Sequence, residues 1–204
     1  MLPLISCLCP TKNKPKIVKK TIEYFKNQTY PNKELILVVN EDSFYLDTVK
    51  KLVNGNVKLF YAPKNTTLGD IRNISVSMAN GMYVAQWDDD NAHHKNRLWM
   101  QYLAIKKSNK KACFLKRVLV NDTISGDKGV SFENSGVEST MLALKSELPK
   151  YPSISVGEDV PIKKYFVDNN KHVILNEPQL YTYNIHSKNT CKYEHLQKMI
   201  DVII

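Results

Sequence analysis

Short apolar runs alternate with amphipathic segments along the first half of the chain. The apolar runs predict strands over residues 4–9, 34–39, 57–61 and 82–87, and apolar residues at helical spacing predict helices over 16–27, 43–52 and 68–79. Pro15 suits a first helical position, Ser43 can cap the next helix, and Gly81 lies just beyond the third. This order predicts an α/β fold with a doubly wound, mostly parallel sheet, which binds ligands at the carboxyl ends of its strands.

The second half is less regular. Residues 112–120 are expected to form one strand, residues 121–136 a turn-rich hairpin, and residues 192–204 a C-terminal helix. An amphipathic helix is expected directly after Asp159. Trp99 lies among apolar residues of another predicted helix, so core packing accounts for it better than sugar stacking. With 204 residues and 43% hydrophobic content, the chain is expected to form a single domain.

Three consecutive carboxylates, Asp88, Asp89 and Asp90, follow the predicted strand 82–87. Adjacent anions repel one another, so a fold that gathers them at a strand end is expected to hold a cation there. Carboxylate oxygens suit Mg²⁺ or Mn²⁺, and both ions keep open positions for substrate phosphates. The alternative is a solvated acidic turn, because acidic residues are common where strands end.

The net charge and the cysteines indicate the kind of partner and the cellular compartment, but they identify no reaction. The formal charge of +9 favours anionic partners, but lysines are scattered along the chain and form no concentrated stripe, so no nucleic-acid partner is expected. The four cysteines lack zinc-type spacing, which favours buried free thiols in a reducing compartment. The apolar run 2–9 is too short for a signal peptide, and no stretch reaches membrane-spanning length. We therefore expect a soluble, cytoplasmic protein.

Several segments resemble, in the right order, motifs of the family 2 inverting glycosyltransferases with the GT-A fold. The resemblance implies one domain over 1–204, with a central sheet, flanking helices and a small acceptor-side subsheet. Residues 1–91 are expected to bind a nucleotide sugar, 92–190 to carry the acceptor side and the catalytic base, and 191–204 to form a helix. The segments that carry the resemblance are residues 9–13, 28–39, 68–73, 79–84, 88–90, 157–159 and 183–190.

The resemblance implies a metal site built from Asp88, Asp90 and His186. Asp90 is the firmer ligand, because the last carboxylate of such a motif typically meets the metal, whereas Asp88 and Asp89 can reach the ribose or a coordinated water. His186 belongs to a late His-x-x-Asn-Thr pattern, and an imidazole ligand suits Mn²⁺ better than Mg²⁺. The alternative interpretation of His186 is a surface histidine in a polar loop. His93 and His94 compete as ligands, but we expect them to open the next helix.

The same resemblance assigns the nucleotide to the turn after the first strand. Pro10, Thr11 and Asn13 match the family's base- and ribose-contacting turn, whereas Lys12 replaces an aromatic residue often found there. Residues 40–43 match the second-strand motif only loosely.

In that second motif Glu41 is preferred to Asp42 by alignment, and an ordinary helix N-terminal acid is the alternative. Arg72 matches the family's Arg-Asn pair, and its planar donors suit a diphosphate or a base carbonyl. A solvated helical arginine is the alternative reading of Arg72.

Glu158 and Asp159 match the family's second catalytic element. An inverting displacement needs a carboxylate to remove the proton of the acceptor hydroxyl, and we assign Asp159 as that base with Glu158 in reserve. The alternative is a helix N-terminus enriched in acids. The assignment requires residues 88–90 and 159 to converge on one cleft.

The expected activity is metal-dependent transfer of a sugar, with inversion, from a nucleotide-diphosphate donor to an acceptor hydroxyl. Mn²⁺ or Mg²⁺ is the expected cofactor, and UDP-sugars are the commonest donors of the family. The acceptor is a glycan, a lipid-linked group or a protein, and the sequence is compatible with a homo-oligomer. The competing hypotheses are a catalytically silent nucleotide-sugar-binding relative and a nucleotidyltransferase.

Overall fold

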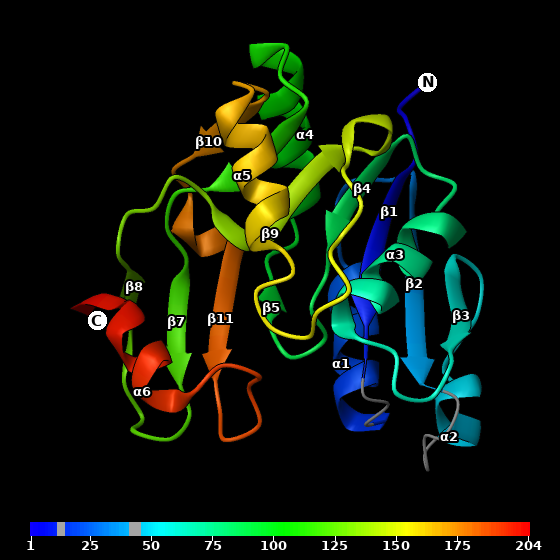
Figure 1. Ribbon diagram of the computed structural model, residues 1–204, viewed down its shortest axis with the longest axis horizontal. Helices are drawn as coiled ribbons and strands as arrows, with labels where there is room; N and C mark the ends of the chain where they lie inside the picture. Colours follow the sequence, from blue (N-terminus) through cyan, green and yellow to red (C-terminus); the bar gives the residue numbers. More distant parts are fainter. Residues whose placement is uncertain (12–14, 41–45) are drawn as a thin grey trace.

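The computed structural model describes residues 1–11, 15–40 and 46–204, which form two sheets flanked by helices (Figure 1). The larger sheet has the strand order β10-β6-β9-β4-β1-β2-β3. All its neighbouring strands run parallel except β9, which is antiparallel to both β4 and β6. The predicted α/β, mostly parallel sheet is therefore confirmed. Its strands are β1 (Ile5–Pro10), β2 (Lys33–Asn40), β3 (Val57–Ala62), β4 (Tyr83–Gln86), β6 (Ala112–Leu115), β9 (Val137–Leu144) and β10 (His172–Leu175).

Helices cover both faces of the larger sheet. The buried side chains of α1 and α4 share one hydrophobic cluster with Cys7 and Cys9 of β1. On the opposite face α3 packs against Leu8 and Ile36, and α5 packs against Phe114. The side chains of each central strand therefore alternate between two helical layers. The helices are α1 (Pro15–Lys26), α2 (Leu46–Lys50), α3 (Leu68–Met78), α4 (Arg97–Ser108), α5 (Val160–Asp168) and α6 (Tyr193–Leu196), with the 3-10 segments η1 (Lys145–Glu147), η2 (Pro178–Leu180) and η3 (Gln197–Met199).

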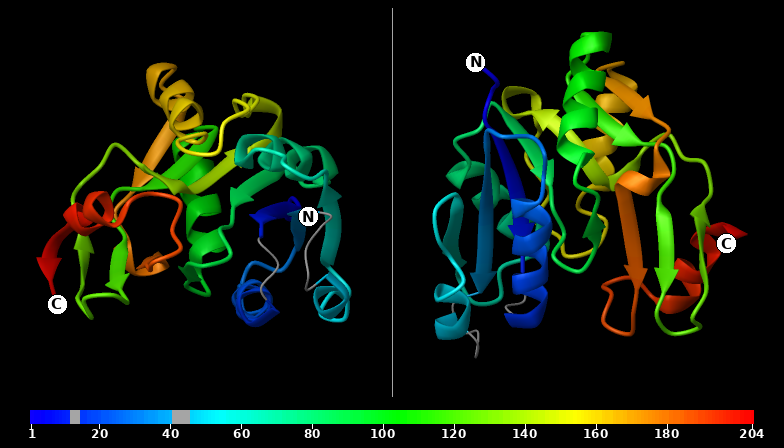
Figure 2. Two further views of the ribbon diagram at one scale, coloured as in Figure 1. Left: turned by 60° about the horizontal axis from the view of Figure 1, so that its bottom comes forward. Right: turned by 180° about the vertical axis from the view of Figure 1, so that it is seen from behind.

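The smaller sheet lies beside the larger one and has its own apolar cluster (Figure 2). Its strand order is β12-β8-β7-β11-β5. It corresponds to the expected small subsheet. Its strand β5 begins two positions after Asp90, the last residue of the acidic triplet. Because β5 pairs antiparallel with β11, the residues that precede β5 lie at the same end of the pair as the residues that follow β11. Its strands are β5 (Ala92–His93), β7 (Leu119–Asp122), β8 (Lys128–Ser131), β11 (Tyr181–Ile185) and β12 (Ile200–Ile203).

Three expectations about secondary structure are wrong. Residues 112–120 form two strands in different sheets, because the backbone N–H of Leu115 donates to the Thr140 hydroxyl and the chain leaves the larger sheet there. The expected helix over 192–204 is a four-residue helix followed by β12, whose backbone pairs with β8. His93 and His94 do not open α4, which begins at Arg97; His93 belongs to β5.

The predicted hairpin after residue 120 is confirmed as β7 and β8, and Trp99 packs against the core near Tyr30, as expected. The thiols of Cys7, Cys9 and Cys113 are free and buried, but Cys191 is exposed, contrary to expectation. Of the helices in the described part of the chain, none is both long enough and apolar enough to span a bilayer.

Candidate active site

The acidic triplet leaves the sheet at the end of β4. Trp87, which is fully buried, still donates its backbone N–H to the Leu8 carbonyl of β1, 3.0 Å away. Its ring stacks on His93 with 3.7 Å between ring centroids. Asp88, Asp89 and Asp90 then follow as half-buried residues. The triplet is therefore fixed on both sides by packed residues and is not a loose solvated turn.

A buried arginine supports this turn through His93. Arg97 is fully buried, and its Nη1 lies 2.6 Å from His93 Nδ1. Because a guanidinium only donates, His93 Nδ1 accepts, and His93 Nε2 donates to the Asp88 carbonyl at 3.2 Å. Burial, reinforced by the Arg97 charge, holds the pKa of His93 well below its usual value. Both nitrogens of His93 are thus committed to the protein, which gives it a structural role.

Arg72 joins the acidic triplet to Glu158, which precedes the candidate base Asp159. Its Nη2 donates to Asp88 Oδ1 at 3.0 Å, and its Nε donates to Glu158 Oε1 at 2.8 Å. Burial acts to lower the pKa of Arg72, but the nearby carboxylates, Asp88 foremost, outweigh it and raise that pKa. Arg72 is almost fully buried, so it is not a solvated helical arginine. Arg72 thus holds Asp88 and Glu158 together, whereas the expected convergence of residues 88–90 with residue 159 on one cleft stays a prediction.

Asp159 occupies the N-cap position of α5, yet its side chain makes no capping hydrogen bond. Instead Gln86 Nε2 donates to Asp159 Oδ2 at 3.1 Å. Burial raises the pKa of Asp159 to about 6, with Glu158 and Asp88 adding to the rise and Arg72 and the Gln86 hydrogen bond opposing it. A carboxylate with this pKa is ionised at neutral pH and still basic enough to accept a proton.

The loop before Glu158 is held against the start of α3. Gly69 donates its backbone N–H to the Ile154 carbonyl at 2.9 Å. A Cβ at residue 69 would lie 1.9 Å from the Pro152 carbonyl oxygen, so only glycine allows this approach. Gly157, with φ of +73°, then turns the chain into residues 158 and 159.

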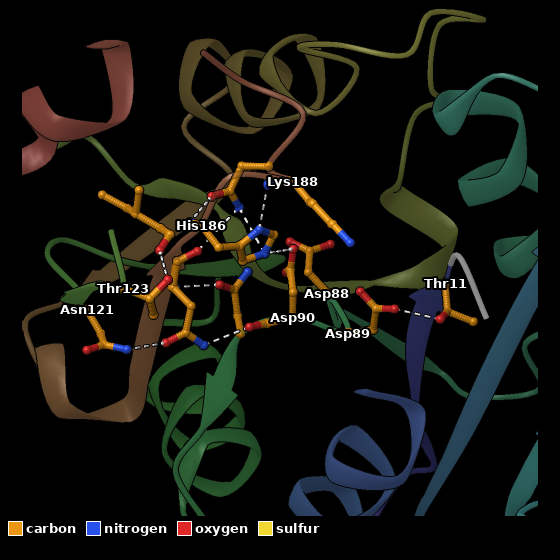
Figure 3. A network of polar contacts seen from close by, with 12 residues as sticks. Thr11, Asp88, Asp89, Asp90, Asn121, Thr123, His186 and Lys188 are labelled. Carbon is orange, nitrogen blue, oxygen red and sulfur yellow. Dashed lines mark hydrogen bonds and ion pairs between the residues drawn. The ribbon is translucent and has the colours of Figure 1, made fainter. Parts of the chain in front are cut away.

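Asp90, between β4 and β5, meets His186, directly after β11, because β5 and β11 pair antiparallel within the smaller sheet. His186 Nε2 lies 3.1 Å from Asp90 Oδ2 (Figure 3). Lys188 donates its backbone N–H to His186 Nδ1, and Asn189 Oδ1 accepts the backbone N–H of His186. Asn184 donates to the Asp90 carbonyl at 2.7 Å. These contacts fix both partners of the pair.

The Asp90 and His186 donors are compatible with a divalent cation. Burial and the Asp88 charge raise the pKa of Asp90 against the opposing effect of His186, and a cation would relieve that unfavourable environment. Octahedral ions with bonds of about 2.1 Å place neighbouring ligands about 3 Å apart, which matches the spacing of Oδ2 and Nε2. No group of three metal-ligating side chains is present among the described residues. Such ions commonly take only one or two carboxylates and complete their shell with substrate phosphates and water.

The tautomer of His186 limits its part in such a site. Its Nδ1 accepts from a backbone N–H, so in the neutral imidazole the proton resides on Nε2. For a neutral imidazole to bind a metal through Nε2, the proton has to move to Nδ1. Nδ1 can then no longer accept from the Lys188 backbone N–H, so that contact breaks. Asp90 is therefore the stronger candidate ligand in this conformation.

Two of the expected nucleotide-contacting residues lie beside the triplet. Pro10 ends β1, and Thr11 donates its hydroxyl to Asp89 Oδ2 at 2.5 Å (Figure 3). Asn13 and Glu41, also expected to contact the donor, lie outside the described residues, as do Lys12, Asp42 and Ser43.

A pocket of about 140 Å³ opens beside Asp89, Asp90, Asn91 and His186, with Ile17, Lys20 and Tyr24 of α1 as its other wall. A larger pocket of about 370 Å³ shares Lys20 and Tyr24 and extends over the smaller sheet. The Asp90–His186 pair therefore borders open space.

Sequence reasoning missed Gln86, Arg97 and Asn184 as parts of this site. Gln86 was visible as a polar residue in an apolar strand, and Asn184 lies inside a motif that was recognised as a whole. The position of Arg97 behind the turn had no signal in the sequence, because it depends on the packing of α4 against β4.

Solved structures of other proteins have the same fold as this chain. The S. aureus TarS 1–349 structure in complex with UDP-GlcNAc matches with a TM-score of 0.74, 19% identity, 91% of this chain and 59% of that chain. The S. aureus TarS 1–349 structure in complex with UDP matches with a TM-score of 0.71, 17% identity, 89% of this chain and 60% of that chain. These likenesses establish the GT-A fold.

Sequence comparison establishes the family. An "Uncharacterized glycosyltransferase" of Haemophilus influenzae is 32% identical over 106 residues, which cover 49% of this chain and 41% of the relative. The chain thus spans less than two thirds of the length of the proteins it matches. Residues 6–155 match the sequence profile described as Glycosyl transferase family 2, about three quarters of the chain. The chain belongs to glycosyltransferase family 2.

Proposed function

We propose that this protein transfers a sugar, with inversion, from a nucleotide-diphosphate donor to an acceptor hydroxyl in a metal-dependent reaction. Family membership supports glycosyl transfer, and the UDP and UDP-GlcNAc complexes of TarS support a UDP-sugar as the donor. The observation that carries the proposal is the Arg72 bridge, which links Asp88 of the acidic triplet to Glu158 beside Asp159. Groups suited to the leaving diphosphate and to proton removal therefore lie in one site.

Asp90, His186 and Asp88 are the proposed metal-binding residues, with Mn²⁺ or Mg²⁺ as the ion. When bound, the ion supplies Lewis-acid stabilisation of the charge that develops on the departing diphosphate. Asp90 is the primary ligand in this proposal, because one Asp88 oxygen is engaged by Arg72 and His186 Nε2 carries a proton. Asp89 and Thr11, which are bonded to each other, flank the proposed ribose site together with Pro10.

Arg72 has a second proposed role as a donor to the diphosphate. Its Nη1 has no hydrogen-bond partner among the residues that the structure describes, so the guanidinium retains a charged N–H for an anionic ligand. Asn13 and Glu41 remain proposed donor contacts.

Asp159 is the proposed general base, and Glu158 is the residue that positions Arg72. The Glu158 carboxylate is almost fully buried and accepts from Arg72, whereas Asp159 is partly exposed and has a pKa of about 6. Removal of the acceptor proton by Asp159 allows the hydroxyl oxygen to attack the anomeric carbon opposite the leaving group. In this division residues 1–91 bind the donor, and residues 92–190, which include the smaller sheet except β12, bind the acceptor.

The test uses purified protein with UDP-sugars, Mn²⁺ and a panel of glycan, lipid-linked and protein acceptors. Release of UDP and the anomeric configuration of the product, read by NMR, are the measurements. Asp159→Asn is expected to lower kcat by about 10²–10⁴-fold, the usual contribution of a general base. Asp168→Asn, which changes an exposed aspartate paired with Lys164, is the matched control and is expected to leave kcat unchanged. A retained anomeric configuration would refute the inverting mechanism.

Donor binding is tested separately by thermal unfolding. A ligand held about 100-fold above its Kd stabilises a protein by about 2.7 kcal/mol, which raises its Tm measurably. UDP with Mn²⁺ is expected to raise the Tm of the wild type, and the rise is expected to disappear in Asp90→Ala. Binding without turnover of any acceptor would favour a catalytically silent relative, and an equal rise in folded Asp90→Ala would contradict the metal assignment.

A further inference from the structure

Gln86 is a polar side chain in the middle of the larger sheet. It ends β4, which is paired on one side with β1 and on the other with β9. Its exposure is 1%. Burying an amide costs free energy unless hydrogen bonds replace its contacts with water, so this position requires an explanation that apolar packing does not give.

The backbone of Gln86 is held in place by Arg97. Arg97 Nη2 donates to the Gln86 carbonyl at 3.0 Å, while Arg97 Nε donates to Gln101 Oε1 at 3.1 Å. Since Arg97 and Gln101 are fully buried, they form a rigid anchor for the end of the strand. The direction of the Gln86 side chain is therefore set by the sheet and not by a mobile loop.

The alternation of β4 directs that side chain to the face that carries the candidate base. Tyr83 and Ala85 belong to the cluster under α1 and α4, and Val84 belongs to the cluster under α3. Gln86, two residues after Val84, projects to the α3 side. There its Nε2 donates to Asp159 Oδ2 at 3.1 Å.

We propose that Gln86 is the positioning residue of Asp159, fixing one carboxylate oxygen so that the other faces the acceptor hydroxyl. This inference rests on the proposed function of Asp159 as general base. The amide N–H stabilises the ionised carboxylate, the form that accepts a proton. Gln86 Oε1 has no partner in the described part of the chain, so the Asp159 contact is the one hydrogen bond recorded for this side-chain amide.

Other groups also act on Asp159, and the test must separate Gln86 from them. Arg72 of α3 lowers the Asp159 pKa, while Glu158 and Asp88 raise it. Tyr151, Tyr183 and Cys191 also interact with the Asp159 charge, and burial raises the pKa of each of these three groups. None of these residues is altered by a substitution at Gln86, so a change in the titration of Asp159 is attributable to the lost amide.

The first experiment measures Asp159 without relying on activity. Side-chain carboxyl carbons of aspartate are followed by NMR against pH, with Asp159→Asn to assign the signal. In Gln86→Met the Asp159 carboxyl is expected to titrate at least half a pH unit higher than in the wild type. The control is Gln28→Met, which removes another buried amide whose hydrogen bonds within the described residues all go to backbone groups. That variant is expected to lose thermal stability without moving the Asp159 titration.

Gln86→Glu keeps the test decisive if Gln86→Met does not fold. A carboxyl at residue 86 would share a proton with Asp159 and is also expected to raise its titration by at least half a unit. An Asp159 titration within 0.2 unit of wild type in a folded Gln86 variant would overturn the inference.

The second experiment uses the transfer reaction. The acid limb of the kcat/KM profile is expected to move upward in Gln86→Met by the shift that NMR records, with recovery of activity at higher pH and an unchanged KM for the donor. A merely structural role would lower Tm and leave the acid limb in place, which would refute the inference. If no transfer is found with any acceptor, the proposed function fails, while the NMR titration still decides whether Gln86 controls the Asp159 carboxyl.

Discussion

Arg72 of α3 and Glu158, 86 positions later in the chain, form an ion pair with 2.8 Å between Nε and Oε1. Their side chains are 5% and 4% exposed, so neither charge can be solvated if the other is removed. Arg72→Met is expected to lower the free energy of unfolding by about 3–5 kcal/mol, the usual cost of breaking a buried pair. Urea denaturation measures the loss.

The control for this pair is the double variant Arg72→Met/Glu158→Gln. It removes the uncompensated charge on Glu158, so it is expected to be more stable than the single Arg72→Met variant although it carries one more change. A double variant less stable than the single one would show that the ion pair is not the main contribution of Arg72.

Asp159 is expected to make stability depend on pH. Its pKa is raised from 3.8 to about 6 in the folded protein by burial, so the folded state binds the proton more tightly than the unfolded state. Ionisation therefore destabilises the fold as pH rises from about 4 to about 6, by up to about 3 kcal/mol at roughly 1.4 kcal/mol per unit. Asp159→Asn lacks this dependence.

The measurement is the difference in free energy of unfolding between Asp159→Asn and the wild type at pH 4 and pH 7. The variant is expected to gain relative stability at pH 7. A difference that stays constant across this range would mean that the Asp159 pKa is not raised by the fold.

Gly69→Ala is expected to displace the loop that leads to Asp159, the proposed base. The added Cβ would lie 1.9 Å from the Pro152 carbonyl oxygen, and rigid backbone has to move to accept it. We expect a loss of about 1–3 kcal/mol, typical of overpacking, together with a fall in kcat. Gly55→Ala, in the turn before β3, is the control for adding a Cβ at an open site, since no atom beyond its chain neighbours lies within 4 Å of the Cβ position, although its φ of +57° adds strain. A crystal structure of Gly69→Ala with residues 152–159 unmoved would contradict the explanation.

His93→Phe tests whether this buried histidine is structural. The substitution keeps a ring against Trp87 but leaves Arg97 Nη1 and the Asp88 carbonyl without their partner. Each lost partner costs about 1–3 kcal/mol, so a clear drop in Tm is expected. The Tm rise with UDP and Mn²⁺ is expected to remain in the folded variant. His94→Phe, at an exposed position, is the control with little effect on Tm; complete loss of the metal-dependent rise in His93→Phe alone would indicate a ligand role.

Much of this architecture follows from local pattern. The apolar runs near β1, β2, β3 and β4 and the amphipathic helices α1 and α3 are correctly placed within about two residues, because parallel strands buried on both faces need continuous apolar sequence. The wrong predictions fall where tertiary pairing overrides pattern. Residues 112–120 look like one strand until the hydrogen bond to Thr140 ends β6, and β12 forms because β8 offers its backbone as a partner.

The sequence by itself determined the sheet, the acidic triplet at its carboxyl edge and the family to which the chain belongs, because these depend on residue type and order. Only the tertiary structure decided which groups hold these acids. Arg72 holds Asp88 and Glu158, Gln86 holds Asp159, and His186 meets Asp90 beside the β5–β11 pair. Except for Arg72 and Asp88, which are 16 positions apart, these contacts join residues 73 to 96 positions apart and so depend on packing. Charge energies depend on burial, so neither is encoded in any single stretch of the chain.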